Sequence, residues 1–270
     1  MEGREWGRLA NFYAGRESNQ KGFIVAHQTI QFLPPEERKD ATNKRVENKI
    51  LLSIPETEFR AIRPHLEAVE LDSHRVLHEA HEALEYAYFP NDGLLSLVVV
   101  LADGKTVEAG IVGKEGLVGI PALAGLSRSP LREVVQITGD GLRISAVTLR
   151  ELLATAQELR HQLERFTVVL GLQVAQTAGC NRLHGVEQRL ARWLLMAQDR
   201  VSSASLPLTH DFLATMLGTD RPSVSLAAGV LQKAKVIEYG RGSVKILDRA
   251  ELERIACECY GVIQRYSVEL

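Results

Sequence analysis

Three polar residues that lie close together in the sequence, Arg221, Ser223 and Ser225, offer hydrogen-bond donors of the kind that nucleic acids accept. A guanidinium can donate two parallel hydrogen bonds to the O6 and N7 atoms of guanine, and a hydroxyl can donate to a phosphate oxygen. This chemistry requires the three side chains to project from one exposed end of a rigid element. The surrounding sequence predicts such an element.

The segment 208–225 is predicted to form two short helices joined by a turn. Thr209 can cap the first helix, whose apolar residues at 212, 213, 216 and 217 share one face. Gly218 falls where the chain must turn, since glycine tolerates a positive φ. The second helix begins near Arg221, with Pro222 acceptable in its first turn. This pattern is typical of a helix-turn-helix, in which the N-terminal end of the second helix enters the major groove of DNA.

A β-hairpin is predicted after the second helix. Two β-rich runs, 235–239 and 243–247, flank the turn Gly240-Arg241-Gly242. The hairpin would form the wing of a winged helix-turn-helix and present basic and hydroxyl groups to a phosphate, whereas an ordinary helical hairpin is the alternative for the helix pair alone. The predicted DNA-contacting residues are Thr209, Arg221, Ser223, Ser225, Arg241 and Ser243.

The composition is that of a globular protein with more than one domain. The chain has 270 residues, of which 45% are hydrophobic and 24% are charged. Because the net charge is −2, any affinity for DNA has to come from a local basic face. The sequence shows neither an apolar run that could span a bilayer nor a signal-peptide pattern, so the expected location is the cytoplasm. The three cysteines predict no disulfide framework.

The sequence divides into four predicted parts. Residues 1–46 mix polar residues with isolated aromatics, which predicts a poorly ordered extension. Residues 47–150 alternate short apolar runs with turn sequences, a pattern typical of an antiparallel barrel or jelly roll. Residues 151–183 form a long helix, and residues 184–270 form the winged domain. The expected fold class is α+β, with an N-terminal double-stranded β-helix (jelly-roll) barrel, a long dimerisation helix and a C-terminal winged helix-turn-helix.

The long helix carries a heptad seam that spans on the order of 30 Å. One interpretation is that the seam pairs two copies of the chain. A homodimer would place two recognition helices roughly 34 Å apart, which matches a palindromic DNA site. The alternative is that the seam packs against the chain's own barrel. The predicted dimerisation residues are Leu159, Leu163, Phe166, Leu170, Gln173 and Thr177, the last two fixing the register.

The order of barrel, long helix, connecting helix and winged helix-turn-helix resembles the Crp–Fnr family of bacterial transcription regulators. The resemblance extends over about residues 48–247, and residues 208–247 are its most specific part. It implies that Arg221 reads guanine, that Ser223 contacts phosphate or base, and that Thr209 contacts phosphate.

The chain departs from the family pattern in both domains. Pro222 and Leu226 stand where the recognition helix of the family often has a Glu and a second Arg, so the family's target sequence does not transfer. In the barrel, Ile120 follows Gly119 where the cyclic-nucleotide cassette has a ribose-binding Glu. Arg132 lies one residue out of register with the phosphate-binding Arg of the family. We therefore predict that the barrel, with Gly119 and Arg132 as candidate ligand residues, does not bind cyclic AMP in the usual manner.

The sequence predicts no metal site, no cofactor and no catalytic residues. Cys257 and Cys259 are placed in a C-terminal helix, where side chains at i and i+2 do not face each other. His74, His78 and His81 would share a face only in a helix, but their surroundings predict strand and turn. No phosphate-binding loop, Gly-x-Ser-x-Gly or His-Glu-x-x-His motif is present.

Together these features predict a homodimeric transcription regulator that binds a palindromic site on double-stranded DNA and is not an enzyme. RNA polymerase and an unidentified small-molecule effector are further partners that such a regulator could have, whereas a membrane is not expected. A signal would act on the hinge near residues 181–186 and change the spacing of the two recognition helices. The alternative function is a ligand-binding or protein-interaction module that does not bind DNA, such as a regulatory subunit.

Overall fold

The computed structural model describes residues 38–201, 203 and 205–267. Most of the predicted N-terminal extension, residues 1–46, therefore lies outside the described residues. Its last part is folded, because Arg38 donates a hydrogen bond of 2.6 Å to the carbonyl of Ile54 and Val46 is fully buried. The folded body thus begins earlier in the sequence than predicted.

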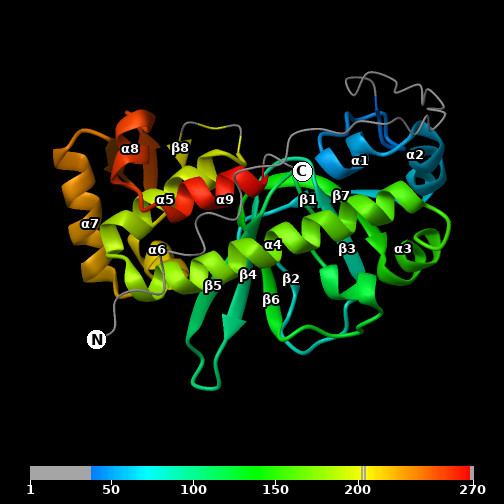
Figure 1. Ribbon diagram of the computed structural model, residues 1–270, viewed down its shortest axis with the longest axis horizontal. Coiled ribbons are helices and arrows are strands. Elements are labelled where there is room, and N and C mark those ends of the chain that lie inside the picture. Colours follow the sequence, from blue (N-terminus) through cyan, green and yellow to red (C-terminus); the bar gives the residue numbers. More distant parts are fainter. Residues whose placement is uncertain (1–37, 202, 204, 268–270) are drawn as a thin grey trace, which may run out of the picture. The chain divides into compact units, whose positions relative to one another are not determined.

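The first part of this body consists of two antiparallel sheets (Figure 1). One sheet has the strand order β1-β7-β3 and the other has the order β2-β6-β4-β5. This arrangement confirms the antiparallel barrel or jelly roll of short strands that the turn spacing predicted. The strands are β1 (Glu67–Leu71), β2 (Val76–His78), β3 (Tyr86–Pro90), β4 (Leu94–Val100), β5 (Thr106–Val112), β6 (Leu131–Ile137) and β7 (Gly139–Ser145).

Short helices complete the apolar core of this barrel. Leu51 from the first helix and Leu149 from a later one are fully buried in the same cluster as the strand residues Leu142 and Val135. Burial of these side chains fixes the helices against the sheets. The helices are α1 (Lys49–Ser53), α2 (Glu56–Ile62), η3 (Arg63–His65), η4 (Ile120–Ala124) and α3 (Ala146–Leu152).

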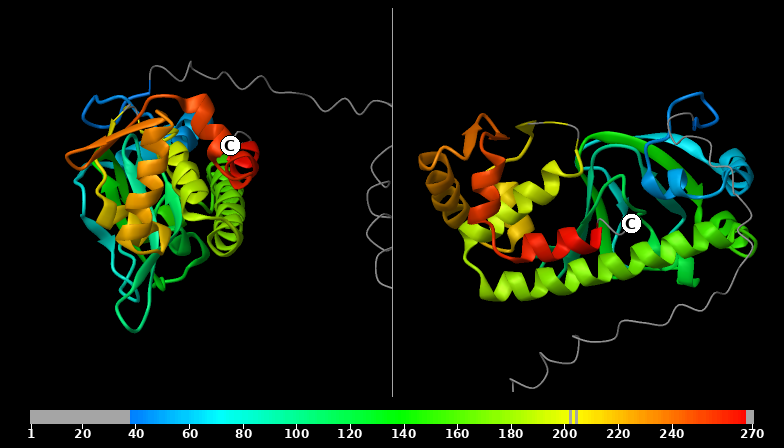
Figure 2. Two further views of the ribbon diagram at one scale, coloured as in Figure 1. Left: turned by 90° about the vertical axis from the view of Figure 1, so that its left-hand side faces the viewer. Right: turned by 45° about the horizontal axis from the view of Figure 1, so that its top comes forward.

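Helix α4 (Gln157–Leu183) runs alongside the barrel (Figure 2). The ring of Phe166 lies over Gly116, where a Cβ atom would come within 2.2 Å of the ring, so this position has no room for a side chain. Further along the helix, the side chain of Gln173 donates a hydrogen bond of 3.1 Å to the carbonyl of Ile111 and accepts one of 3.2 Å from its amide. These bonds satisfy a buried amide side chain, which would otherwise cost stability.

The heptad seam of α4 is consequently buried within the chain itself. Its four apolar residues lie in the core of the barrel, Gln173 bonds to β5, and Thr177 lies 3.5 Å from Arg192 of α5. This corrects the expectation that the seam pairs two subunits and largely matches the stated alternative. The heptad pattern marked the buried face correctly but could not reveal what covers it. The other face of α4 exposes Val168, Leu172 and Leu183. The six buried residues are Leu159, Leu163, Phe166, Leu170, Gln173 and Thr177.

The remainder of the chain forms a helical domain with a small sheet of order β8-β10-β9. Its core is centred on Trp193, whose ring meets that of Phe212 edge-on with 5.9 Å between the centroids. The elements are α5 (Val186–Gln198), β8 (Ser205–Leu206), α6 (His210–Leu217), α7 (Arg221–Lys233), β9 (Ile237–Gly240), β10 (Ser243–Ile246), α8 (Arg249–Ile255) and α9 (Cys259–Ser267).

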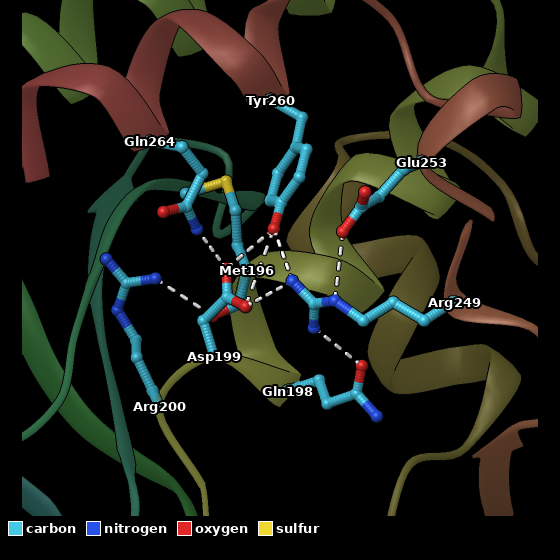
Figure 3. Close-up of polar contacts among 8 residues, drawn as sticks. All are labelled: Met196, Gln198, Asp199, Arg200, Arg249, Glu253, Tyr260 and Gln264. Atoms are coloured by element: carbon cyan, nitrogen blue, oxygen red, sulfur yellow. Dashed lines mark hydrogen bonds and ion pairs between the residues drawn. The ribbon is translucent and has the colours of Figure 1, made fainter. Parts of the chain in front are cut away.

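A polar network at the C-terminal end of α5 holds the last two helices in place (Figure 3). The carboxylate of Asp199 accepts hydrogen bonds from Arg249 of α8 (2.7 Å) and from Tyr260 of α9 (3.1 Å). Gln264 of α9 also donates to Asp199. Burial and the neighbouring Asp199 charge raise the pKa of the Tyr260 hydroxyl, so it remains a donor at neutral pH.

Among the described residues, no helix combines the length and apolar character that crossing a bilayer requires.

Candidate nucleic-acid interface

Helix α6 begins and ends as its sequence predicted. The Thr209 hydroxyl oxygen accepts a hydrogen bond of 3.2 Å from the amide of Phe212, which caps the first turn. Gly218 ends the helix with φ 58°, a backbone conformation that favours glycine. Leu213 and Leu217 point into the core, so the helix is fixed in one orientation.

Helix α7 follows after a short turn and presents its first turn to solvent. Asp220 caps it, because its carboxylate accepts hydrogen bonds from the amide (2.8 Å) and the hydroxyl (3.0 Å) of Ser223. These bonds lower the pKa of the Asp220 carboxyl. Val224 is completely buried against the core. The opposite face exposes Arg221 and Leu226, the latter to 74%.

The guanidinium of Arg221 is held loosely beside the first helix. Its Nε atom lies 3.6 Å from a carboxylate oxygen of Asp211, and the two side chains are 64% and 70% exposed. An ion pair in this much water contributes little stability. The guanidinium is therefore not fixed in this ion pair and is available to another hydrogen-bond acceptor.

Substituting Asp211→Asn is expected to strengthen specific DNA binding modestly, by less than about 1 kcal/mol, because it removes the carboxylate that competes for Arg221. Fluorescence anisotropy measures the change, on a labelled duplex that contains a binding site selected from genomic DNA with the purified protein. In the double variant Asp211→Asn/Arg221→Ala the gain should vanish. A gain that persists without Arg221 would mean that the substitution acts through net charge alone.

His210 connects the recognition helix to the wing. Its ring stacks on Tyr239 with 4.0 Å between centroids, and its Nδ1 atom lies 2.9 Å from the hydroxyl of Ser225. Burial, followed by the positive charge of Arg221, lowers the pKa of this imidazole. The ring is therefore neutral at physiological pH. The Ser225 hydroxyl also donates to the Arg221 carbonyl at 3.0 Å, so this serine shapes the helix end as well.

The wing turns through two residues, Arg241 and Gly242. Both have positive φ, 49° and 79°, as a type I′ hairpin turn requires. The turn is thus one residue shorter than the predicted Gly-Arg-Gly turn, because Gly240 pairs with Ser243 in the sheet. The Ser243 hydroxyl donates to the Gly240 carbonyl at 3.1 Å, whereas Arg241 extends into solvent.

The structure adds two groups that the sequence prediction missed. Lys245 is exposed on β10, and Val230 is exposed one turn after Leu226 on α7. The alternation Val244 in, Lys245 out, Ile246 in could have identified the lysine as a solvent-facing cation of the wing. All six predicted DNA-contacting residues lie on α6, α7 and the wing or at their caps: Thr209, Arg221, Ser223, Ser225, Arg241 and Ser243.

The barrel contains a separate polar cavity of about 620 Å³. Neither candidate ligand residue lines it. The Gly119 amide donates a hydrogen bond of 3.3 Å to the Glu133 carboxylate, and Arg132 pairs with Glu79 at 2.8 Å. Glu133 is buried and also pairs with the ring of His78. The Gly119 amide and the Arg132 guanidinium thus both have carboxylate partners within the chain, which a ligand would have to displace. Their assignment as ligand residues stays a prediction.

Comparisons with known proteins agree with this architecture. Residues 188–255 match the model of the Crp-like helix-turn-helix domain. No curated protein matches the sequence.

Among solved structures, FixK2 from Bradyrhizobium japonicum is similar with a TM-score of 0.62 and 15% identity, and the match covers 71% of this chain and 98% of that one. The c-di-GMP responsive global regulator CLP from Xanthomonas campestris has a TM-score of 0.60 and 15% identity, with 70% and 98% covered. A CRP-family transcriptional regulator from Thermus thermophilus has a TM-score of 0.59 and 22% identity, with 70% and 96% covered. The matched part of the chain therefore has the fold of these proteins.

Proposed function

We propose that this protein, with the Crp–Fnr fold and a Crp-like helix-turn-helix domain, is a DNA-binding transcription regulator. The observation that carries the proposal is the exposed first turn of α7 with Arg221 at its start, next to a wing with Arg241 at its tip. A helix end that offers a guanidinium, flanked by a basic wing, suits a major groove bordered by phosphates.

The exposed side chains of α7 and of the wing have different roles in this docking. Arg221 reads guanine through two parallel hydrogen bonds, as the family resemblance also implies. Leu226 and Val230, exposed to 74% and 46% on the same helix, suit apolar contact with thymine methyl groups. Arg241 and Lys245 neutralise phosphates and contribute affinity without sequence preference. The preferred half-site would therefore combine one guanine with neighbouring thymines.

The regulator acts as a homodimer on a palindromic operator in this proposal. Because the heptad seam is covered by the barrel, pairing would use the opposite face of α4. That face carries Val168, Leu172 and Leu183, which are 63%, 43% and 78% exposed, together with the small residues Gly171 and Ala175. Apolar and small residues at helical spacing allow two helices to approach closely.

The barrel serves as a scaffold, or it senses an effector other than cyclic AMP. Support comes from Glu133, a buried carboxylate that accepts from the Gly119 amide and would repel a cyclic phosphate. RNA polymerase is the further partner that an activator of this kind would contact.

The salt dependence of binding tests the proposal. Binding to a labelled genomic duplex should weaken steadily as salt rises, and Arg241→Ala should reduce the slope of log K against log salt by about one per subunit. Arg254→Ala, which removes an exposed arginine of α8 outside the proposed interface, is the matched control and should leave the slope unchanged. Absence of binding even at low salt would instead favour a protein-interaction module.

A further inference from the structure

All three cysteines of the chain come together with one histidine in the folded structure. The ligand atoms of Cys180, His184, Cys257 and Cys259 all lie within 4.8 Å of one another. The Sγ atoms of Cys180 and Cys257 are 3.4 Å apart, and Sγ of Cys259 is 3.5 Å from Nδ1 of His184. The three cysteines are at most 4% exposed.

The local structure explains why the sequence pattern failed to predict this cluster. Helix α8 ends at Ile255, and Cys257 lies in the connection before Cys259 opens α9. The two thiols are therefore not held at i and i+2 of one helix, which corrects the helical placement on which the expectation of no metal site rested. The other two ligands come from the end of α4 and its C-cap, which α9 lies alongside (Figure 2).

We propose that Cys180, His184, Cys257 and Cys259 bind one Zn²⁺ ion in a tetrahedral Cys₃His site. Zinc with Zn–S distances of about 2.3 Å and Zn–N distances of about 2.0–2.1 Å spaces its ligand atoms roughly 3.6–3.8 Å apart. Two spacings in the cluster, 3.4 Å between Cys180 and Cys257 and 3.5 Å between Cys259 and His184, are close to this range. An iron–sulfur cluster would need some of its thiolates further apart, because they bind different iron atoms.

The groups around these four residues suit a bound cation. The Nε2 atom of His184 lies 3.3 Å from the carboxylate of Glu258, which leaves Nδ1 directed toward the thiols. Zinc-bound histidines commonly donate their second N–H to a carboxylate in this way. Gln176 donates a hydrogen bond of 3.1 Å to the Cys259 sulfur, which helps to orient this ligand.

The charges around the cluster suit an ion as well. A Zn²⁺ ion bound by three thiolates and a neutral histidine would leave one negative charge. The buried Arg189 and Arg192 of α5, the helix that begins just after His184, would balance it.

Metal content tests this proposal directly. Protein purified under reducing conditions and without chelator is expected to carry one zinc ion per chain by elemental analysis. Cys180→Ser, Cys259→Ser and His184→Ala should each lose most of it, with circular dichroism used to confirm that the variants fold. His161→Ala, an exposed histidine on the same helix α4, is the matched control and should keep its zinc. Substitution by Co²⁺ should give the intense absorption of a tetrahedral thiolate site.

Three results would overturn the proposal. The first is reduced, folded protein that takes up no Zn²⁺ or Co²⁺ at micromolar concentration. The second is a Cys180–Cys257 disulfide in the native protein, found by mass spectrometry, with no metal uptake after reduction. The third is His184→Ala or Cys259→Ser retaining the full zinc content. None of these measurements involves DNA, so the zinc site and the proposed function can fail independently.

The position of the site gives it a consequence for regulation, which rests on the proposed function. The ion would tie the end of α4 to the start of α9, across the turn that leads into α5 and the DNA-binding domain. Zinc removal by a chelator should therefore weaken operator binding by wild-type protein at least tenfold, and readdition of Zn²⁺ should restore it. Unchanged operator affinity in verified metal-free protein would rule out this coupling between zinc and DNA binding. It would not contradict the proposal that the four residues bind zinc.

Discussion

Replacing Arg221 by alanine is expected to weaken binding to the cognate operator by roughly 1–3 kcal/mol for each half-site. The guanidinium lies at the exposed start of α7, where the solvated carboxylate of Asp211 competes for it. A dimer would lose the contact twice, so the total effect is the largest among the DNA-contacting residues. Quantitative gel shift or anisotropy at fixed salt measures it.

The same variant should also lose discrimination at a single base pair of each half-site. Wild-type protein should bind an operator in which the proposed guanine is replaced more weakly than the original operator. The Arg221→Ala variant should bind the two operators with equal affinity. The salt slope should change little, in contrast to Arg241→Ala, because Arg221 contacts a base rather than a phosphate. Wild-type affinity in the Arg221 variant at matched salt would show that α7 does not dock by its N-terminal end.

The second large effect concerns the junction between the barrel and the winged domain. Glu108 of β5 is buried and accepts a hydrogen bond of 2.7 Å from the indole of Trp193 on α5, and a further one from Ser96 of β4. Burial raises the pKa of this carboxyl from 4.5 to about 7 despite both hydrogen bonds. Stability is therefore expected to depend on pH in a range where most carboxyls have already ionised.

The direction of this dependence follows from proton binding. Between pH 4.5 and about 7 the unfolded chain releases the Glu108 proton while the folded chain retains it, so stability falls as the pH rises through this window. Above about pH 7 both states are ionised and the penalty stays constant. Because one pKa unit corresponds to about 1.4 kcal/mol, the loss between pH 5 and pH 8 amounts to about 2–3 kcal/mol.

The variant Glu108→Gln isolates this contribution, because the amide oxygen can still accept from Trp193 but cannot ionise. Its free energy of unfolding relative to wild type should rise by about 2–3 kcal/mol between pH 5 and pH 8 in urea titrations. Glu164→Gln, which changes an exposed glutamate on α4, should show no such change. Parallel pH profiles for wild type and Glu108→Gln would mean that Glu108 is already ionised when folded at pH 5.

Local interactions made the winged helix-turn-helix domain predictable from its sequence. Thr209, Gly218 and the Arg241-Gly242 turn each determine the backbone within a few residues, so the structure they specify does not depend on the rest of the fold. Strand β8 was missed because its two residues pair only with the distant strand β10. The barrel was predicted in type, but its strand order depends on long-range pairing that turn spacing does not encode.

Two features depended on partners far apart in the sequence and were predicted incorrectly. The seam of α4 was recognised by its spacing, yet whether Phe166 and Leu170 meet a second subunit or their own barrel depends on the position of Gly116 and Gly110. Likewise, Cys180 and Cys257 are 77 residues apart, and they meet because α8 ends at Ile255 and α9 packs alongside α4. Helical periodicity does not show which distant segment covers the α4 seam, nor that Cys180 and Cys257 lie close together.

The most direct test of the regulator function is selection of genomic DNA fragments by the purified full-length protein, without added ligand and across a salt series. The proposal predicts enrichment of one inverted repeat whose half-site centres lie about one helical turn, 10–10.5 bp, or a multiple of it apart. Guanine should be fixed at one position of each half-site. Recovery of no sequence even at low salt, or of a site without two-fold symmetry, would contradict a homodimer that reads DNA through α7.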